Sequence, residues 1–190
     1  MNTAELAKYS NSVLNKASNI HSIHSENSEL SVALKGLYIK EDLLFCKLSF
    51  KNNSDKSATY YVLSFRGRTP IDIPRGKKGG GTFMVDWKDI IVKKTDKGES
   101  RQIFDQPSPM FQRFDMHATN LNPGMISHPP HTHRSEEIIL MIKGDVQMQI
   151  GENFFNATSG DVILLEGNVP HALNNTGSEQ CSYYAIQWHN

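Results

Sequence analysis

Residues 124–144 read GMISHPPHTHRSEEIILMIKG, a segment in which clustered histidines are followed by a charged pair and an apolar run. His131 and His133 are two positions apart, so on an extended segment both imidazoles face the same side. Glu137 begins the apolar run that follows, where a turn can bring its carboxylate to the same point. His171 comes from a later strand, which the curvature of a barrel can carry across to the first three. We therefore expect these four side chains to gather one metal ion.

The expected ligand set indicates one divalent transition metal. Three neutral imidazoles and one carboxylate suit Mn, Fe, Co, Ni, Cu or Zn, and residue type does not choose among them. Four protein ligands leave an octahedral ion two open positions, which metal-assisted chemistry on a chelating substrate requires. The alternative is two surface histidines on a strand. Because Glu137 and His171 also stand in register with His131 and His133, metal ligation is favoured over two surface histidines.

Two further histidines are candidate catalytic residues. His128 lies one short step upstream of the ligand segment and could line the pocket mouth or replace a ligand. His117 alternates with the apolar Phe114 and Met116, and on a face that lines the pocket it would support a ligand or transfer protons. For each histidine the alternative is a solvated surface position.

Short strands separated by turns dominate the chain and predict an all-β sandwich or barrel. Strands are predicted at residues 59–65, 83–92, 111–119, 136–142, 146–150, 161–165 and 181–188. Within 146–150, either the apolar or the glutamine set must face the barrel. One short helix is predicted at about 4–17 from a weak amphipathic stripe. The segment PRGKKGGG at 74–81 predicts a flexible joint between two halves.

The chain also repeats itself weakly. The segment His21-Ser-Ile-His24-Ser-Glu26 parallels His128-Pro-Pro-His131-Thr-His133, and Asn52-Asn53-Ser54 parallels Asn174-Asn175-Thr176. The first half is shorter between the compared landmarks, 37–51 against 145–173, by about two strands. It therefore cannot close a barrel alone, and we expect strands within 28–65 to add to the second-half barrel or to a partner chain.

The second half resembles the cupin superfamily and is identified as a Cupin_2-like metal-binding barrel over about residues 110–190. The first cupin motif, Gly-x5-His-x-His-x3–4-Glu-x6-Gly, fits from His131 to Gly144, with Gly124 one residue too far upstream. The second motif, Gly-x5-Pro-x-Gly-x2-His-x3-Asn, is matched at Gly160, His171 and Asn175. Glu166 and Asn168 replace its proline and glycine.

This resemblance implies a double-stranded β-helix, the cupin or jelly-roll barrel, with the metal inside and extra N-terminal strands. With the repeat, it implies a bicupin: residues 1–72 a shortened, degenerate half, 73–100 a linker and connecting strand, and 101–190 the cupin domain with the metal site. No metal is expected in the first half, because Glu26 replaces the second motif histidine and Ser49 falls where His171 would align. Cupins resemble one another in dimerising through sheet edges, so a homodimer is expected.

The resemblance leaves the function open, because cupins carry many activities. The leading interpretation is an isomerase-like metal enzyme acting on a small oxygenated metabolite, such as a sugar or uronate derivative. The metal would stabilise an enediolate while His117 or His128 moves the proton. The alternatives are an Fe-dependent dioxygenase and a non-catalytic small-ligand (sugar) binding module. A pocket without titratable groups beyond the metal ligands would favour the binding module.

Composition disfavours several other classes. Lys+Arg and Asp+Glu balance at 20 each, so no global field recruits nucleic acid or an anionic membrane. No apolar run approaches the ~20 residues needed to span a bilayer. The first residues, MNTAELAKYSNSVLNKASNI, show no export signal. We expect a soluble chain, in a compartment that the sequence does not indicate. Cys46 and Cys181, each in an apolar run, are expected to be buried free thiols.

Overall fold

The computed structural model describes residues 30–40, 43–65, 70–81, 83 and 85–190. The chain divides into two compact units, Met1–Ser64 and Phe65–Asn190. The helix predicted at 4–17 and the segment His21–Glu26 lie outside the described residues. No helix in the described part of the chain has the length and apolar character to cross a membrane.

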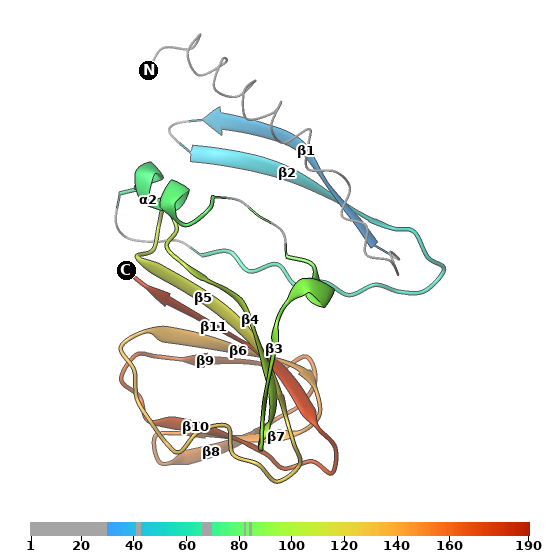
Figure 1. Cartoon of the computed structure of the whole chain (residues 1–190), viewed down its shortest axis with the longest axis vertical. Coiled ribbons are helices and arrows are strands. Elements are labelled where there is room, and N and C mark those ends of the chain that lie inside the picture. The colour runs from blue at the N-terminus through green and yellow to red at the C-terminus, as the bar shows by residue number, and fades with distance from the viewer. Residues whose placement is uncertain (1–29, 41–42, 66–69, 82, 84) are drawn as a thin grey trace. The chain divides into compact units, whose positions relative to one another are not determined.

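The first unit contains one antiparallel hairpin. Strands β1 (Leu30–Lys40) and β2 (Leu43–Asn52) form a two-stranded sheet with one register shift between Leu34 and Gly36 (Figure 1). The strand predicted at 59–65 is wrong, because this aromatic run is irregular and pairs with no strand among the described residues. The degenerate cupin-like half, the bicupin and the homodimer stay predictions.

The second unit is built from two antiparallel sheets, which confirms the all-β, jelly-roll class. The six-stranded sheet has the order β3-β4-β5-β11-β6-β9, and the three-stranded sheet the order β10-β7-β8. In chain order the strands are β3 (Val92–Thr95), β4 (Gly98–Gln106), β5 (Arg113–Leu121), β6 (Glu136–Lys143), β7 (Val146–Ile150), β8 (Asn153–Ala157), β9 (Val162–Leu165), β10 (His171–Asn175) and β11 (Cys181–His189). Figure 1 shows the smaller sheet as a separate layer facing β11, β6 and β9.

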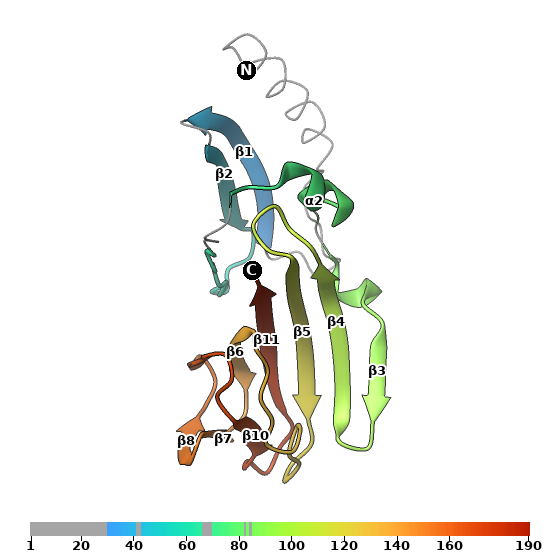
Figure 2. The same cartoon turned by 90° about the vertical axis from the view of Figure 1, so that its left-hand side faces the viewer.

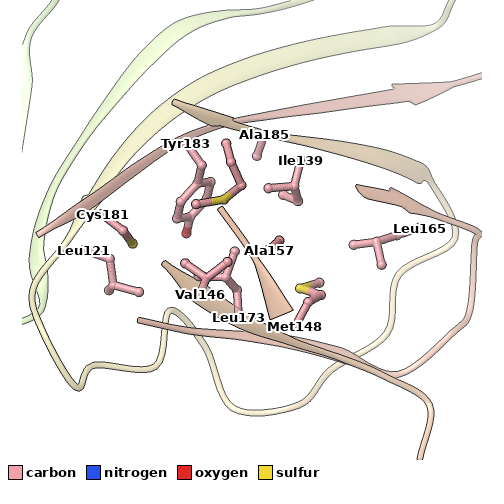
Figure 3. Close-up of a cluster of buried hydrophobic side chains, with 11 residues drawn as sticks. Leu121, Ile139, Val146, Met148, Ala157, Leu165, Leu173, Cys181, Tyr183 and Ala185 are labelled. Atoms are coloured by element: carbon pink, nitrogen blue, oxygen red, sulfur yellow. The ribbon is translucent and has the colours of Figure 1, made fainter. Parts of the chain in front are cut away.

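The core lies between these two sheets. Figure 3 shows side chains from both layers pointing toward one another, with Ile139, Tyr183 and Ala185 on one side and Val146, Met148 and Leu173 on the other. The apolar set of β7 therefore faces the interior: Val146 and Met148 are 0% and 1% exposed. Cys181 is a buried free thiol, as predicted. The side chain of Cys46 lies outside the described part.

The opposite face of the larger sheet carries a second, aromatic layer. The ring of Phe65 lies 5.1 Å from that of Phe114 and 4.9 Å from that of Trp188. Trp87 packs edge-on against Tyr184 at 6.4 Å. The outer face of β5 and β11 is therefore covered by aromatic rings, and the aromatic side chains of Tyr184 and Trp188 serve packing.

The segment before β3 is folded differently from its prediction. Within the predicted strand 83–92, the Asp86 carboxylate caps the 3-10 helix η1 (Trp87–Asp89) by accepting from Lys88 N at 3.1 Å, so that strand is wrong before Val92. Residues 74–81, predicted as a flexible joint, include most of helix α2 (Ile73–Lys78). Arg75 ties this helix to the loop before β5 through hydrogen bonds of 2.9 Å to Ser108 O and Pro109 O.

Candidate metal centre

His131 and His171 are held opposite each other by the backbone. They form an isolated antiparallel bridge, in which His131 N donates to His171 O at 3.2 Å and His171 N to His131 O at 3.0 Å. The loop 126–131 thus runs beside β10, and Ser127 N donates to Leu173 O at 2.9 Å. Two histidines forty residues apart in the chain are brought together by this pairing.

His133 lies in the loop just before β6 and Glu137 is the second residue of that strand, on the other wall of the site. His133 is anchored by its carbonyl, which accepts from Asn168 N at 2.7 Å. Asn168 adopts a left-handed φ of 64°, a conformation that Asn tolerates better than most residues and that the motif's glycine adopts freely. The departure from the motif at this position is therefore compatible with the turn that supports His133.

The three histidines converge on one point and could hold a metal ion. One ring nitrogen from each of His131, His133 and His171 lies within 4.8 Å of the other two. Glu137 Oε2 lies 3.4 Å from His133 Nε2 and 3.5 Å from His171 Nε2. The fold thus brings the four predicted residues into one cluster, with His171 and Glu137 buried and His131 exposed at its edge.

The far nitrogen of each histidine is held by a backbone carbonyl two residues away. The Nδ1 atoms of His131, His133 and His171 lie 3.2, 2.8 and 2.8 Å from the carbonyl oxygens of Pro129, Ser135 and Val169. A carbonyl only accepts, so each contact assigns the proton to Nδ1 and the lone pair to Nε2. This is the tautomer that a metal ligand needs.

The Nε2 atoms of the histidines are placed to bind a metal ion rather than to form hydrogen bonds within the cluster. Within the described residues, Nε2 of His133 and Nε2 of His171 are buried and have no hydrogen-bond partner. Buried polar atoms without partners are costly and rare in native structures. A divalent cation between Glu137 and the three lone pairs would satisfy them all at once.

A hydrogen-bonded bridge that the sequence analysis missed connects two of the candidate ligands. Gln187 Nε2 donates to Glu137 Oε1 at 3.0 Å, and Ser135 Oγ donates to Gln187 Oε1 at 3.3 Å. Ser135 Oγ also lies 3.0 Å from His133 Nδ1. The signal for Gln187 was its alternation with the inward-facing Tyr183 and Ala185, which becomes informative once the inner face of β11 is known.

The surroundings of Glu137 favour its ionised form, the carboxylate, over its protonated form. Burial, the largest influence, raises the pKa of Glu137, but contacts with His171 and Gln187 and the nearby His133 outweigh it, and the pKa lies below its usual value. The Glu137 carboxylate in turn raises the pKa of His171. Without a metal, these two groups therefore stabilise each other as an ion pair.

A small cavity lies against the cluster and contains both candidate catalytic histidines. Its volume is about 70 Å³, and His117 and His128 line it together with His131, Glu137 and His171. His117 Nδ1 lies 3.4 Å from Oδ1 of the buried Asp115, whose other oxygen accepts from Arg113 Nη2 at 2.8 Å. The structure therefore gives His117 an orienting carboxylate that the sequence analysis did not identify.

The cavity wall also contains two groups whose protonation is shifted. Partial desolvation, then the neighbouring His131 and Lys97, lower the pKa of His128. Burial raises the pKa of Tyr183 to about 12, against the opposing effect of hydrogen bonds to Thr119 and Ser127. At neutral pH the cavity thus offers a neutral imidazole and a protonated phenol.

Comparison with known proteins identifies the domain that holds this site. The family model described as "Cupin domain" matches residues 118–187, which include all four residues of the cluster, His128 and Gln187. No curated protein matches the chain.

Several solved structures are similar to more than half of this chain. An RmlC-like cupin from Shewanella frigidimarina is 10% identical, with a TM-score of 0.48, over 58% of this chain and 93% of that one. The polyketide cyclase RemF from Streptomyces resistomycificus is 17% identical, with a TM-score of 0.49, over 57% and 80%. KdgF from Halomonas sp. is 12% identical, with a TM-score of 0.47, over 58% and 96%.

Proposed function

The chain belongs to the cupin superfamily, and from this premise we propose that it is a metal-dependent enzyme acting on a small oxygenated metabolite, such as a sugar or uronate derivative. His131, His133, Glu137 and His171 would hold one divalent transition metal. The reaction would be isomerase-like, with a proton moved at a carbon next to a carbonyl group.

One observation supports the metal more than any other. The three histidines each face a carbonyl through Nδ1, while the buried Nε2 atoms of His133 and His171 face Glu137 without a hydrogen bond. Three imidazoles and one carboxylate suit Mn, Fe, Co, Ni, Cu or Zn. A bound ion of this kind would act as a Lewis acid that polarises the carbonyl of a chelating substrate.

The remaining residues of the cavity supply the proton transfer. His117, oriented through Nδ1 by Asp115, has Nε2 left to accept a proton from the substrate carbon and return it to the neighbouring one. His128, with its lowered pKa, is neutral near pH 7 and is the second candidate base. The Tyr183 hydroxyl stays protonated and can donate to a substrate oxygen.

The same two histidines favour an enzyme over a passive binding module. A module that only holds its ligand needs the metal and a complementary pocket. This cavity includes His117 and His128 beyond the metal cluster, and His117 has its own buried carboxylate partner. Perturbed or oriented titratable groups beside a metal are typical of catalytic sites.

The test is solvent deuterium exchange under anaerobic conditions. Wild-type protein is loaded separately with Mn²⁺, Fe²⁺, Co²⁺, Ni²⁺ and Zn²⁺ and incubated with aldoses, ketoses and hexuronates in D₂O. NMR then reports deuterium at the carbon next to the carbonyl. We expect exchange with at least one metal, its loss on chelation and in His133→Ala, and a reduction in His117→Asn of ~10²-fold or more.

Other outcomes would contradict the proposal in distinct ways. Turnover that appears only with Fe²⁺ and dioxygen would identify a dioxygenase. Metal-dependent binding without exchange or conversion would identify a binding module. Exchange that survives removal of the metal would place the chemistry elsewhere.

A further inference from the structure

A polar groove continues from the metal cavity across β3, β4 and β5. It has a volume of about 710 Å³ and shares His117, Ser127, His128 and Tyr183 with the cavity. The cavity alone, at about 70 Å³, is far below the ~300–1,000 Å³ of ordinary small-molecule sites. A ligand that reaches the metal cluster therefore has room for only one end there, and its remainder is directed into the groove.

The groove exists because the two sheets differ in width. The smaller sheet packs its apolar side chains against β11 and β6, and Figure 2 shows β4 and β3 extending past it. The uncovered inner face carries the polar residues Lys93, Ser100, Gln102 and Thr119, with Ile91 and Leu121 beside them. A sheet face that is polar where no layer covers it, and continuous with a cavity, is suited to a hydrophilic ligand.

The pairing of the strands aligns these polar groups in a row. Lys93 pairs with Ser100, Ser100 with Thr119, and Thr119 with Tyr183, so one cross-strand line runs from β3 to the cavity wall. Gln102 pairs with His117 in the parallel line. Directly paired residues have Cβ atoms ~4.5–5.5 Å apart, a spacing that lets one extended ligand contact several of them.

The charges of the groove favour an acidic ligand. Arg101 Nη1 lies 2.7 Å from Glu99 Oε1, and Asn120 donates to the same carboxylate at 2.9 Å. The negative charge of Glu99 is therefore balanced by the positive charge of Arg101. Lys93 and Lys97 then outweigh Asp96 along the groove. Lys97 lies at the junction with the cavity, where its Nζ donates to Ser127 O at 3.2 Å.

Much of the groove lies outside the segment that the family model matches. β3 and β4 lie before residue 118, where the family match begins. Together with the turn between them, these two strands contribute Lys93, Lys97 and Ser100 to the groove.

We propose that the groove binds the non-reacting portion of an acidic, hydroxyl-rich oligomer, so that the substrate is the end of a short uronate chain rather than a free monosaccharide. The inference rests on the proposed function for the chemistry at the metal end. Hydroxyl and amide side chains would bind the sugar hydroxyls, and Lys93 would contact a carboxylate one or two units from the reacting end.

The experiment compares galacturonate with trigalacturonate by isothermal titration calorimetry. Wild-type Zn²⁺-loaded protein, the same protein after chelation, and the variants Lys93→Ala, Ser100→Phe and Lys94→Ala are used. Lys94 is the matched control, because it follows Lys93 and points to the other face of the strand. Circular dichroism and melting temperature establish that each variant is folded.

The expected result is trimer binding at least tenfold tighter than monomer binding in wild type. Lys93→Ala weakens trimer binding by about threefold to fivefold, as for an exposed ion pair. Ser100→Phe removes most of the gain by filling the groove, and neither change alters monomer binding. Lys94→Ala leaves both affinities unchanged.

The remaining outcomes separate the two proposals. Equal affinity for trimer and monomer in metal-loaded protein overturns the groove proposal and leaves the metal chemistry standing. Tighter trimer binding that Lys93→Ala weakens but chelation does not supports the groove and contradicts metal-dependent recognition. Binding of neither ligand overturns the groove proposal, while the metal chemistry is judged by the exchange experiment with the other sugars and metals. An equal loss in Lys94→Ala overturns the groove as a specific site.

Discussion

Gln187 Nε2 donates a 3.0 Å hydrogen bond to Glu137 Oε1, although fifty residues separate the two in the chain. This bond engages one carboxylate oxygen and leaves Oε2 turned toward His133 and His171. Through Ser135, the same amide is linked to the His133 ring. The fourth candidate ligand is thus oriented by a residue on β11, far from the motif that contains it.

Replacing Gln187 with Ala should weaken metal binding by about 10–100-fold, the usual effect of losing a group that orients a ligand. The Glu137 carboxylate would lose its donor and become free to rotate away from the histidines. Competition with a chromophoric chelator measures the dissociation constant. Gln147→Ala, on the outward side of β7, is the control. An unchanged affinity would show that Glu137 needs no such support.

Chelation of metal-loaded wild-type protein at pH 7.5 should lower the melting temperature by several degrees. A ligand that binds only the folded state stabilises it by ~2.7 kcal/mol when its free concentration is a hundredfold above Kd. His133→Ala should melt near the chelated wild type and ignore chelator. The control is Thr132→Ala, an exposed position between two candidate ligands, which should behave as wild type. Identical melting of verified metal-loaded and stripped protein would exclude a stabilising role.

The stability of the metal-free protein should change with pH in the opposite direction from its metal affinity. The folded pKa of His171 is raised from 6.5, so its contribution to stability is complete below 6.5 and lost as pH rises through the folded value. The folded pKa of Glu137 is lowered from 4.5, so its contribution is present above 4.5 and lost as pH falls through the folded value. The pair should therefore stabilise chelated protein most between about pH 4.5 and 6.5.

This pH dependence is measured as the difference in melting temperature between chelated wild type and Glu137→Gln from pH 4 to 8.5. The difference should be largest near pH 5–6 and shrink toward pH 8. The neighbouring, exposed Glu136→Gln serves as the control. Metal affinity, by contrast, should fall as pH drops through the histidine range, because protons compete for Nε2. A difference that is flat with pH would mean that His171 and Glu137 do not interact in the metal-free state.

Gly144→Ala should destabilise the fold by about 2–5 kcal/mol, combining left-handed strain with overpacking. Gly144 has a φ of 83°, and an added Cβ would lie 2.8 Å from Cys181 Cβ. Gly151→Ala is the matched control: its φ is 60°, but its Cβ would meet open space, so only the strain of about 1–2 kcal/mol applies. Chemical denaturation compares the two. Equal losses would mean that the contact with Cys181 relaxes without cost.

Much of the barrel and its cluster could be inferred from local pattern. The strands from 136 to 188 are rich in β-branched and aromatic residues, and their turns contain Gly or Asn where the backbone requires them, as at Gly144. The His131, His133, Glu137 and His171 spacing predicted a cluster that the fold does bring together. The turns and the His131–Glu137 segment depend on residues close in sequence, and the spacing of the two cupin motifs indicated that His171 would join them, so the sequence was sufficient for these features.

Only the tertiary structure decided what surrounds the cluster. Gln187, Asp115 and Tyr183 gain meaning from cross-strand pairing and burial, which local composition does not encode. The aromatic runs at 59–65 and 83–91 looked like strands, but a strand needs a partner edge that sequence propensity cannot supply. The polar groove likewise arises because one sheet is wider than the other, a property of how the strands assemble in space.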